Sequence, residues 1–94
     1  MLLSRLVSAL PKILSRTEGD PDITSIEENS RNVKPGSLFV ARRGMNMDGH
    51  KYIADAIAHG ASAIVVENVG QVINLPYIHV PDSSEALAWL CAAF

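Results

Sequence analysis

The chain has 94 residues, of which 48% are hydrophobic and 19% are charged, and its net charge is −2. This composition fits one packed globular domain and excludes a disordered tail. The acidic balance also excludes the electrostatic footprint of a nucleic-acid-binding protein. A single cysteine, Cys91, permits no internal disulfide, and no apolar run reaches the length of a membrane span. We therefore expect a cytoplasmic protein, with Cys91 as a buried, inert thiol.

The amino-terminal segment, residues 1–17, carries Arg5, Lys12 and Arg16 but no acidic residue. Such a composition is typical of an organelle transit peptide. Leucine, isoleucine and valine also recur in it at helical spacing, which is typical of a helix that packs one face on the domain. Under the second interpretation the helix ends between Pro11 and Ser15, because proline interrupts helical hydrogen bonding. Residues 18–22 then form a polar linker.

Two short strands follow the linker. The β-branched stretch 23–26 predicts the first strand, and Asn29, Ser30 and Arg31 form a polar turn after it. Pro35 and Gly36 occupy the central positions that a type II turn prefers, and the second predicted strand covers residues 38–41.

A loop between Gly44 and Gly49 joins the second strand to a helix predicted over residues 50–59, with Asp48 or Gly49 as its cap. The two glycines have the spacing of a phosphate-binding P-loop, but His50 and Lys51 stand where that motif needs lysine and then serine or threonine. We therefore do not expect ATP hydrolysis at this loop. The loop either approaches a ligand through its main chain or is only a connection.

The remaining residues continue the alternation. Unbroken apolar runs predict strands at 63–66 and 77–80, and Asp82 with Glu85 forms a capping box that opens a strongly apolar helix. We expect Trp89, Leu90 and Phe94 to face the core. The order predicts an α/β fold with three layers, in which helices cover both faces of a mostly parallel open sheet.

The ordered set of motifs resembles the amino-terminal domain of the Mur ligases of peptidoglycan synthesis. The motifs are Ile-Thr-Ser-Ile at 23–26, Asn-Ser-Arg at 29–31, Pro-Gly-Ser-Leu-Phe-Val-Ala at 35–41, Gly44, Asp-Gly-His-Lys-Tyr-Ile at 48–53, Ala56-Ile57, Gly60-Ala61 and Ala-Ile-Val-Val-Glu at 63–67. They resemble most the type that adds the third peptide residue, UDP-N-acetylmuramoyl-tripeptide synthetase. The resemblance covers residues 21–94.

This resemblance implies that the parent enzyme joins meso-diaminopimelate or lysine to UDP-N-acetylmuramoyl-L-alanyl-D-glutamate, with ATP and magnesium bound by other domains of the same chain. The 94 residues would be a truncated amino-terminal UDP-binding domain, with a leading helix and linker at 1–20 and an α/β core at 21–94. It implies no catalytic residue and no metal ligand here. The residues implied to contact the UDP portion are Ser30, Glu28, Met45, Asn46 and Met47.

Two positions depart from the family pattern. Asn29 stands where the family has aspartate, and Glu28 stands where relatives have an apolar residue. Two alternatives stay open: the amino-terminal domain of the ligase that adds D-alanyl-D-alanine, and a ligand-free α/β interaction module. The histidines His50, His59 and His79 lack metal-type spacing and are interpreted as structural or exposed.

Overall fold

The computed structural model describes residues 1–43, 48–70 and 74–94, and these build a five-stranded sheet. The strand order is β1-β5-β4-β3-β2. Strands β2 to β5 pair in parallel, whereas β1 pairs with β5 in the antiparallel direction. The strands are β1 (Ser15–Arg16), β2 (Ser25–Glu27), β3 (Ser37–Val40), β4 (Ala63–Val66) and β5 (Tyr77–His79).

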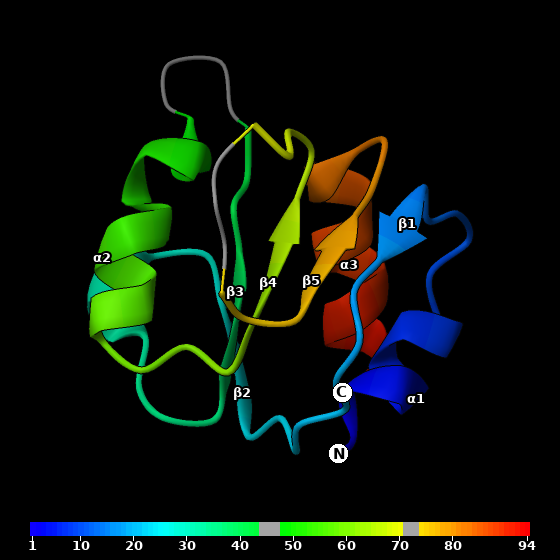
Figure 1. Ribbon diagram of the computed structural model, residues 1–94. Coiled ribbons are helices and arrows are strands. Elements are labelled where there is room, and N and C mark those ends of the chain that lie inside the picture. Colours follow the sequence, from blue (N-terminus) through cyan, green and yellow to red (C-terminus); the bar gives the residue numbers. More distant parts are fainter. Residues whose placement is uncertain (44–47, 71–73) are drawn as a thin grey trace.

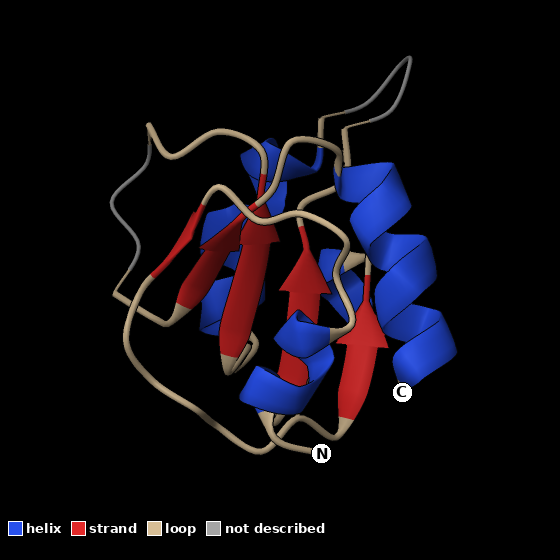
Figure 2. Ribbon diagram, turned by 90° about the vertical axis from the view of Figure 1, so that its right-hand side faces the viewer, coloured by secondary structure: helices blue, strands red, loops and turns tan. Residues whose placement is uncertain are grey.

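Helices cover both faces of this sheet. Figure 1 shows α1 (Leu3–Ser8) and α3 (Ser83–Ala93) on one face and α2 (Ile53–Ala58) on the other. Two 3-10 helices, η1 (Ser30–Asn32) and η2 (Gly49–Tyr52), contact α2, and η2 leads directly into it. Figure 2 shows the strands side by side between the helical layers. The predicted three-layer α/β fold with a mostly parallel sheet is confirmed.

The core consists of two apolar clusters, one on each face of the sheet. Every residue of β3 and β4 is buried, so their unbroken apolar runs serve both faces at once. Leu38 and Val65 belong to the cluster beneath α1 and α3, together with Leu90. Phe39 and Ile64 belong to the cluster beneath α2.

Three local predictions about turns and caps are confirmed. Gly36 has φ +93°, and the backbone N–H of Ser37 donates to the carbonyl oxygen of Lys34 at 2.9 Å, which closes the predicted turn. Gly60, just past α2, has φ +101°, a conformation that L side chains rarely adopt. The Asp82 carboxylate accepts from the backbone N–H of Glu85 at 3.0 Å and caps α3.

The amino-terminal prediction needs correction. The first helix ends at Ser8 rather than between Pro11 and Ser15, and Ser15–Arg16 form strand β1 where no strand was predicted. The strand is held by main-chain bonds to β5, in which the N–H of Leu14 donates to the carbonyl of His79 at 2.7 Å. Pro11 ends the helix early, and the segment after it gains hydrogen bonds at the sheet edge that a helix could not reach.

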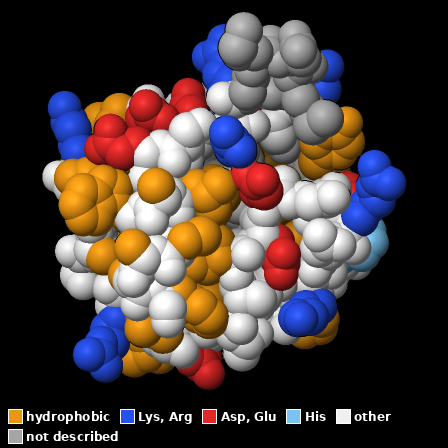
Figure 3. Space-filling view, turned by 180° about the vertical axis from the view of Figure 1, so that it is seen from behind, with side chains coloured by type: hydrophobic (Ala, Val, Ile, Leu, Met, Phe, Trp, Pro, Cys, Tyr) orange, Lys and Arg blue, Asp and Glu red, His pale blue; other side chains and the backbone are white. Residues whose placement is uncertain are grey.

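The face of α3 also differs from the prediction. Leu90 is fully buried, but Trp89 and Phe94 are each 49% exposed, and Cys91 is exposed rather than buried. An apolar sequence all around the helix offers no contrast that marks the buried stripe. Figure 3 shows hydrophobic side chains gathered on the side of the molecule that carries α1 and α3. Within the described residues, no helix is long and apolar enough to cross a membrane.

Candidate functional site

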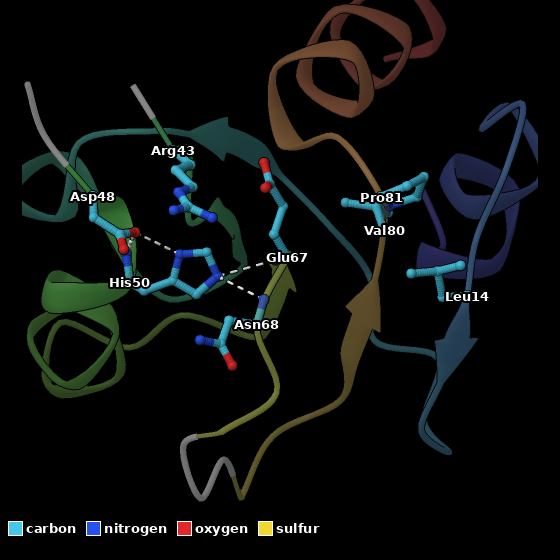
Figure 4. Close-up of a pocket in the computed structure, with 8 residues that line it drawn as sticks. All are labelled: Leu14, Arg43, Asp48, His50, Glu67, Asn68, Val80 and Pro81. Atoms are coloured by element: carbon cyan, nitrogen blue, oxygen red, sulfur yellow. Dashed lines mark hydrogen bonds and ion pairs between the residues drawn. The ribbon is translucent and has the colours of Figure 1, made fainter. Parts of the chain in front are cut away.

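The carboxyl ends of the four parallel strands share one edge of the sheet, where ligands of open α/β sheets bind. A pocket of about 290 Å³ opens there. Figure 4 shows that Arg43, Asp48 and His50 line one side of it and Leu14, Val80 and Pro81 the other, with Glu67 and Asn68 between them. The lining comes from the ends of β3, β4 and β5, from η2 and from the residue before β1.

His50 is the best-connected side chain of the pocket. Its exposed fraction is 6%, so its ring is almost fully buried. The Nε2 atom accepts from the backbone N–H groups of Glu67 at 3.0 Å and Asn68 at 3.1 Å. The Nδ1 atom lies 2.7 Å from Oδ1 of Asp48. The imidazole therefore joins the start of η2 to the chain that leaves β4.

Asp48 caps η2 and closes the loop that follows β3. Its carboxylate accepts from the backbone N–H of His50 at 3.0 Å, and this bond, followed by the bond to the His50 ring, holds the pKa of the Asp48 carboxyl below its ordinary value. Asp48 also forms an isolated antiparallel bridge with Arg43. The two ends of the Gly44–Gly49 loop are thereby joined at its base.

Gly49 lies against the main chain at this base. Its N–H donates to the carbonyl oxygen of Arg42 at 2.7 Å. A Cβ at Gly49 would lie 2.7 Å from the backbone nitrogen of Arg42 and 2.8 Å from its carbonyl oxygen. Close approach of two backbones, rather than a left-handed conformation, requires glycine here.

A second polar cluster joins Glu67 to the start of α3. Oε2 of Glu67 accepts from the backbone N–H of Ser83 at 2.8 Å and from its hydroxyl at 2.5 Å. The Ser83 hydroxyl oxygen also accepts from the backbone N–H of Arg43 at 3.0 Å, although Ser83 is fully buried. A ring nitrogen of His79 lies 2.9 Å from the Glu67 carbonyl oxygen. The ends of β3, β4 and β5 are thus tied together.

Two of the predicted site residues, Ser30 and Glu28, follow strand β2 at the same edge of the sheet. Ser30 begins η1 after β2 and is 5% exposed, and no described residue hydrogen-bonds its hydroxyl. Glu28 lies beside it and accepts from Arg42 at 3.0 Å. Asn29 keeps the turn bond, since its side chain accepts from the backbone N–H of Arg31 at 3.0 Å. Three predicted residues fall outside the described residues: Met45, Asn46 and Met47.

The construction of the pocket is not evident from the sequence. His50 was interpreted only as structural or exposed, and Glu67, Asn68 and Ser83 were given no role. The only available signal was the Asp-Gly-His sequence at the loop's end, next to an apolar strand that closes on glutamate. Nothing in the spacing predicts that the histidine ring reaches the chain after β4.

The described residues do not fit ATP with magnesium. At the position of the P-loop lysine stands His50, whose ring is engaged with Asp48 and with the chain after β4. The Asp48 carboxylate at the loop's base would repel a triphosphate. In the described ranges, no group of three His, Cys, Asp or Glu side chains could hold a metal ion.

Comparisons with known proteins point to one family. The model of the Mur ligase family, catalytic domain, matches residues 22–94. UDP-N-acetylmuramoyl-L-alanyl-D-glutamate–2,6-diaminopimelate ligase from Geobacillus thermodenitrificans is 45% identical over 94 residues, which are 100% of this chain and 19% of that protein. UDP-N-acetylmuramyl-tripeptide synthetase from Deinococcus radiodurans is 41% identical over 97 residues, covering 99% of this chain and 20% of that protein. The chain spans about a fifth of the length of these curated relatives.

Solved structures share the fold. UDP-N-acetylmuramoylalanyl-D-glutamyl-2,6-diaminopimelate–D-alanyl-D-alanyl ligase from Acinetobacter baumannii superimposes with a TM-score of 0.78 at 24% identity, over 96% of this chain and 20% of that one. The MurF ligase from Thermotoga maritima, solved in complex with ADP, gives a TM-score of 0.61 at 36% identity. That match covers 70% of this chain and 15% of the Thermotoga chain.

Proposed function

The chain belongs to the Mur ligase family, and from this premise we propose that it holds the UDP portion of UDP-N-acetylmuramoyl-L-alanyl-D-glutamate. In this proposal the chain is the amino-terminal domain of an ATP-dependent ligase that adds the third residue of the peptidoglycan peptide. ATP and magnesium bind in other domains of that enzyme, because the loop between Gly44 and Gly49 lacks the residues that hold them. The 94 residues by themselves then have no ligase activity.

The observation that carries the proposal is the environment of Ser30. This serine is 5% exposed, and among the described residues its hydroxyl has no hydrogen-bond partner. Among the described residues no fully buried side-chain oxygen lacks a partner, so the Ser30 hydroxyl reaches the surface and is available to a ligand atom. Ser30 also lies at the carboxyl edge of the parallel sheet, where nucleotides bind in open α/β folds.

Uracil needs a donor and acceptors at its edge, and the proposed contacts supply both. The Asn46 amide and the main chain of Met45 and Met47 offer donors and acceptors for the base, and the Ser30 hydroxyl meets another polar atom of the UDP portion. Glu28 lines the same side, and its ion pair with Arg42 at 3.0 Å lowers the repulsion between its carboxylate and a diphosphate.

The amino acid that the parent enzyme adds is proposed from the curated relatives. The similar proteins from Geobacillus thermodenitrificans and Listeria monocytogenes are named as 2,6-diaminopimelate ligases and are 45% and 38% identical to this chain. We therefore favour diaminopimelate over lysine as the third residue. The structural likeness to the D-alanyl-D-alanyl ligase, at 24% identity, reflects the shared fold and does not favour that reaction.

Titration of the ¹⁵N-labelled chain with UDP tests the proposal by NMR. We expect amide shifts concentrated at Ser30 and at residues 45–48, with weak affinity because other domains supply part of the substrate contacts. CDP is the control ligand, since cytosine exchanges a donor and an acceptor at the base edge, and it should bind more weakly.

Two variants locate the site. Ser30→Ala should weaken UDP binding roughly three- to tenfold without unfolding the chain, because it removes one ligand hydrogen bond. Ser8→Ala, at an exposed serine of α1 that bonds only within its own helix, should leave the affinity unchanged. An absence of shifts at millimolar UDP favours the ligand-free interaction module. Unchanged affinity in Ser30→Ala removes Ser30 from the site.

A further inference from the structure

We infer that His50 is a positioning residue of the nucleotide site. Its neutral imidazole holds the base of the Gly44–Gly49 loop, formed by Arg43, Asp48 and Gly49, against the end of β4, and thereby fixes the position of Glu28 and Ser30. This inference rests on the proposed function. His50 itself touches no nucleotide in it. The histidine acts through Asp48, through Gly49 and through Arg42, whose carbonyl oxygen accepts a hydrogen bond from Gly49.

The hydrogen bonds determine the protonation state that this role needs. Two backbone N–H groups, from Glu67 and Asn68, point at Nε2 from 3.0 and 3.1 Å. A backbone N–H only donates, so Nε2 must offer its lone pair and carry no proton. The ring proton then lies on Nδ1 and is donated to Oδ1 of Asp48 at 2.7 Å. The imidazole is neutral in this arrangement (Figure 4).

A continuous set of contacts leads from this imidazole to the predicted nucleotide contacts. Asp48 and Gly49 are bonded to the chain after β3, by the bridge to Arg43 and by the N–H of Gly49 to the carbonyl oxygen of Arg42. The Arg42 guanidinium in turn donates to Oε2 of Glu28 at 3.0 Å. A shift of the imidazole would therefore move the loop's base and release Glu28, which precedes Ser30 by two residues.

Protonation of the ring should break this arrangement. A proton on Nε2 would face the N–H groups of Glu67 and Asn68, and both hydrogen bonds would be lost. The charged groups that face the ring are Asp48 and Arg43 at the loop's base and the Glu67 side chain at the end of β4. His79, on β5, contacts the Glu67 carbonyl from the other side. Nucleotide affinity should therefore be lower for a chain whose His50 ring is protonated than for one whose ring is neutral.

The test measures the affinity of the 94-residue chain for UDP-N-acetylglucosamine by NMR titration between pH 5.5 and 8. This probe carries no phosphate proton that titrates in this range, so any pH dependence belongs to the protein. His50→Gln keeps an acceptor near the Nε2 position and loses the bond to Asp48. His50→Asn keeps a donor toward Asp48 and loses the Nε2 acceptor. The control is His59→Gln, because His59 is an exposed histidine of the α2 end that bonds Asp55.

We expect both His50 variants to bind about tenfold more weakly at pH 8. The wild-type chain and His59→Gln should lose affinity by about tenfold when the His50 ring becomes protonated, a state that the ring resonances report directly. His50→Gln should show no such step, a result that general loss of stability would not produce.

The outcomes separate this inference from the proposed function. If the wild-type chain shows no shift with millimolar probe at any pH, the proposed function fails and the positioning role fails with it. If the chain binds but its affinity is the same whether the His50 ring resonances report a neutral or a protonated ring, only the role of His50 is overturned. The wild-type profile alone decides this, even if both His50 variants fail to fold. Equal affinities of the wild type and the folded variants at pH 8 also overturn it.

Discussion

Replacing Ser83 with alanine removes a single oxygen atom from the hydrogen bonds that connect the start of α3 to the residues after β3 and β4. Ser83 is fully buried, and its hydroxyl donates to Glu67 at 2.5 Å while its oxygen accepts from the Arg43 N–H at 3.0 Å. A neutral hydrogen bond contributes roughly 0.5–1.5 kcal/mol to stability and one to a charged group roughly 1.5–3 kcal/mol. We therefore expect Ser83→Ala to lower the free energy of unfolding by about 2–4 kcal/mol.

A loss of this size is large for a chain of 94 residues. Such a domain has a free energy of unfolding of roughly 5–14 kcal/mol. Urea unfolding followed by far-ultraviolet circular dichroism measures the difference, which exceeds the extrapolation error of about 10–15%. The matched control is Ser84→Ala, at an exposed serine whose hydroxyl accepts from Arg42 at 3.2 Å, and its expected loss is under about 0.5 kcal/mol.

A double-mutant cycle isolates the bond between Ser83 and Glu67. With Glu67→Ala as the partner substitution, which removes the acceptor that a glutamine would keep, we expect a coupling energy of at least about 1 kcal/mol, because residues in one hydrogen-bonded network are not additive. The reasoning is refuted if Ser83→Ala costs no more than Ser84→Ala. Additive effects in the cycle would place the stabilising contribution of Ser83 on the Arg43 side instead.

Two further predictions concern the base of the Gly44–Gly49 loop and the loss of stability at low pH. Gly49→Ala should destabilise the chain by roughly 1–3 kcal/mol, because its Cβ would meet the Arg42 backbone nitrogen at 2.7 Å; a urea midpoint equal to that of the wild type would contradict this. The backbone N–H groups of Ser4 and His50 lower the pKa of the Asp20 and Asp48 carboxyls from the ordinary value of 3.8. A carboxyl whose pKa is lower in the folded chain than in the unfolded chain stabilises the fold at pH values above 3.8, and this contribution is lost as the pH falls below 3.8. In thermal melting between pH 5 and 2.5, the melting temperature should therefore fall more steeply for the wild type than for the double variant Asp20→Asn/Asp48→Asn. If the melting temperatures of both chains fall equally, these hydrogen bonds do not determine the loss of stability at low pH.

Several features of the fold follow from neighbouring residues alone. The apolar runs of β3 and β4 predict strands that are covered on both faces, and the observed burial agrees. Gly36 and Gly60 have the positive φ that their positions in a turn and after a helix predict. Asp82 caps the helix that follows it. In each case the interaction that decides the structure spans only a few residues, and the sequence displays both partners together.

The site was predictable only in part, because its contacts join distant segments. The sequence and its family resemblance indicated Ser30 and Glu28, which follow β2 at the carboxyl edge of the parallel strands. The contact of Nε2 of His50 with Asn68 spans 18 residues, and nothing in the local pattern indicates it. Met45, Asn46 and Met47 stay predictions, since they lie outside the described residues.

The sequence by itself thus determined the alternation of strands and helices, the caps and turns, and the family to which the site belongs. Only the tertiary structure decided that Ser15–Arg16 join the sheet, that Trp89 lies outward while Leu90 lies inward, and that His50 ties the loop to β4. The physical reason is the range of the forces involved. Propensity and capping act within one turn of chain, whereas the edge of a sheet, the buried stripe of a uniformly apolar helix and the partner of a buried imidazole depend on which surfaces the completed fold brings together.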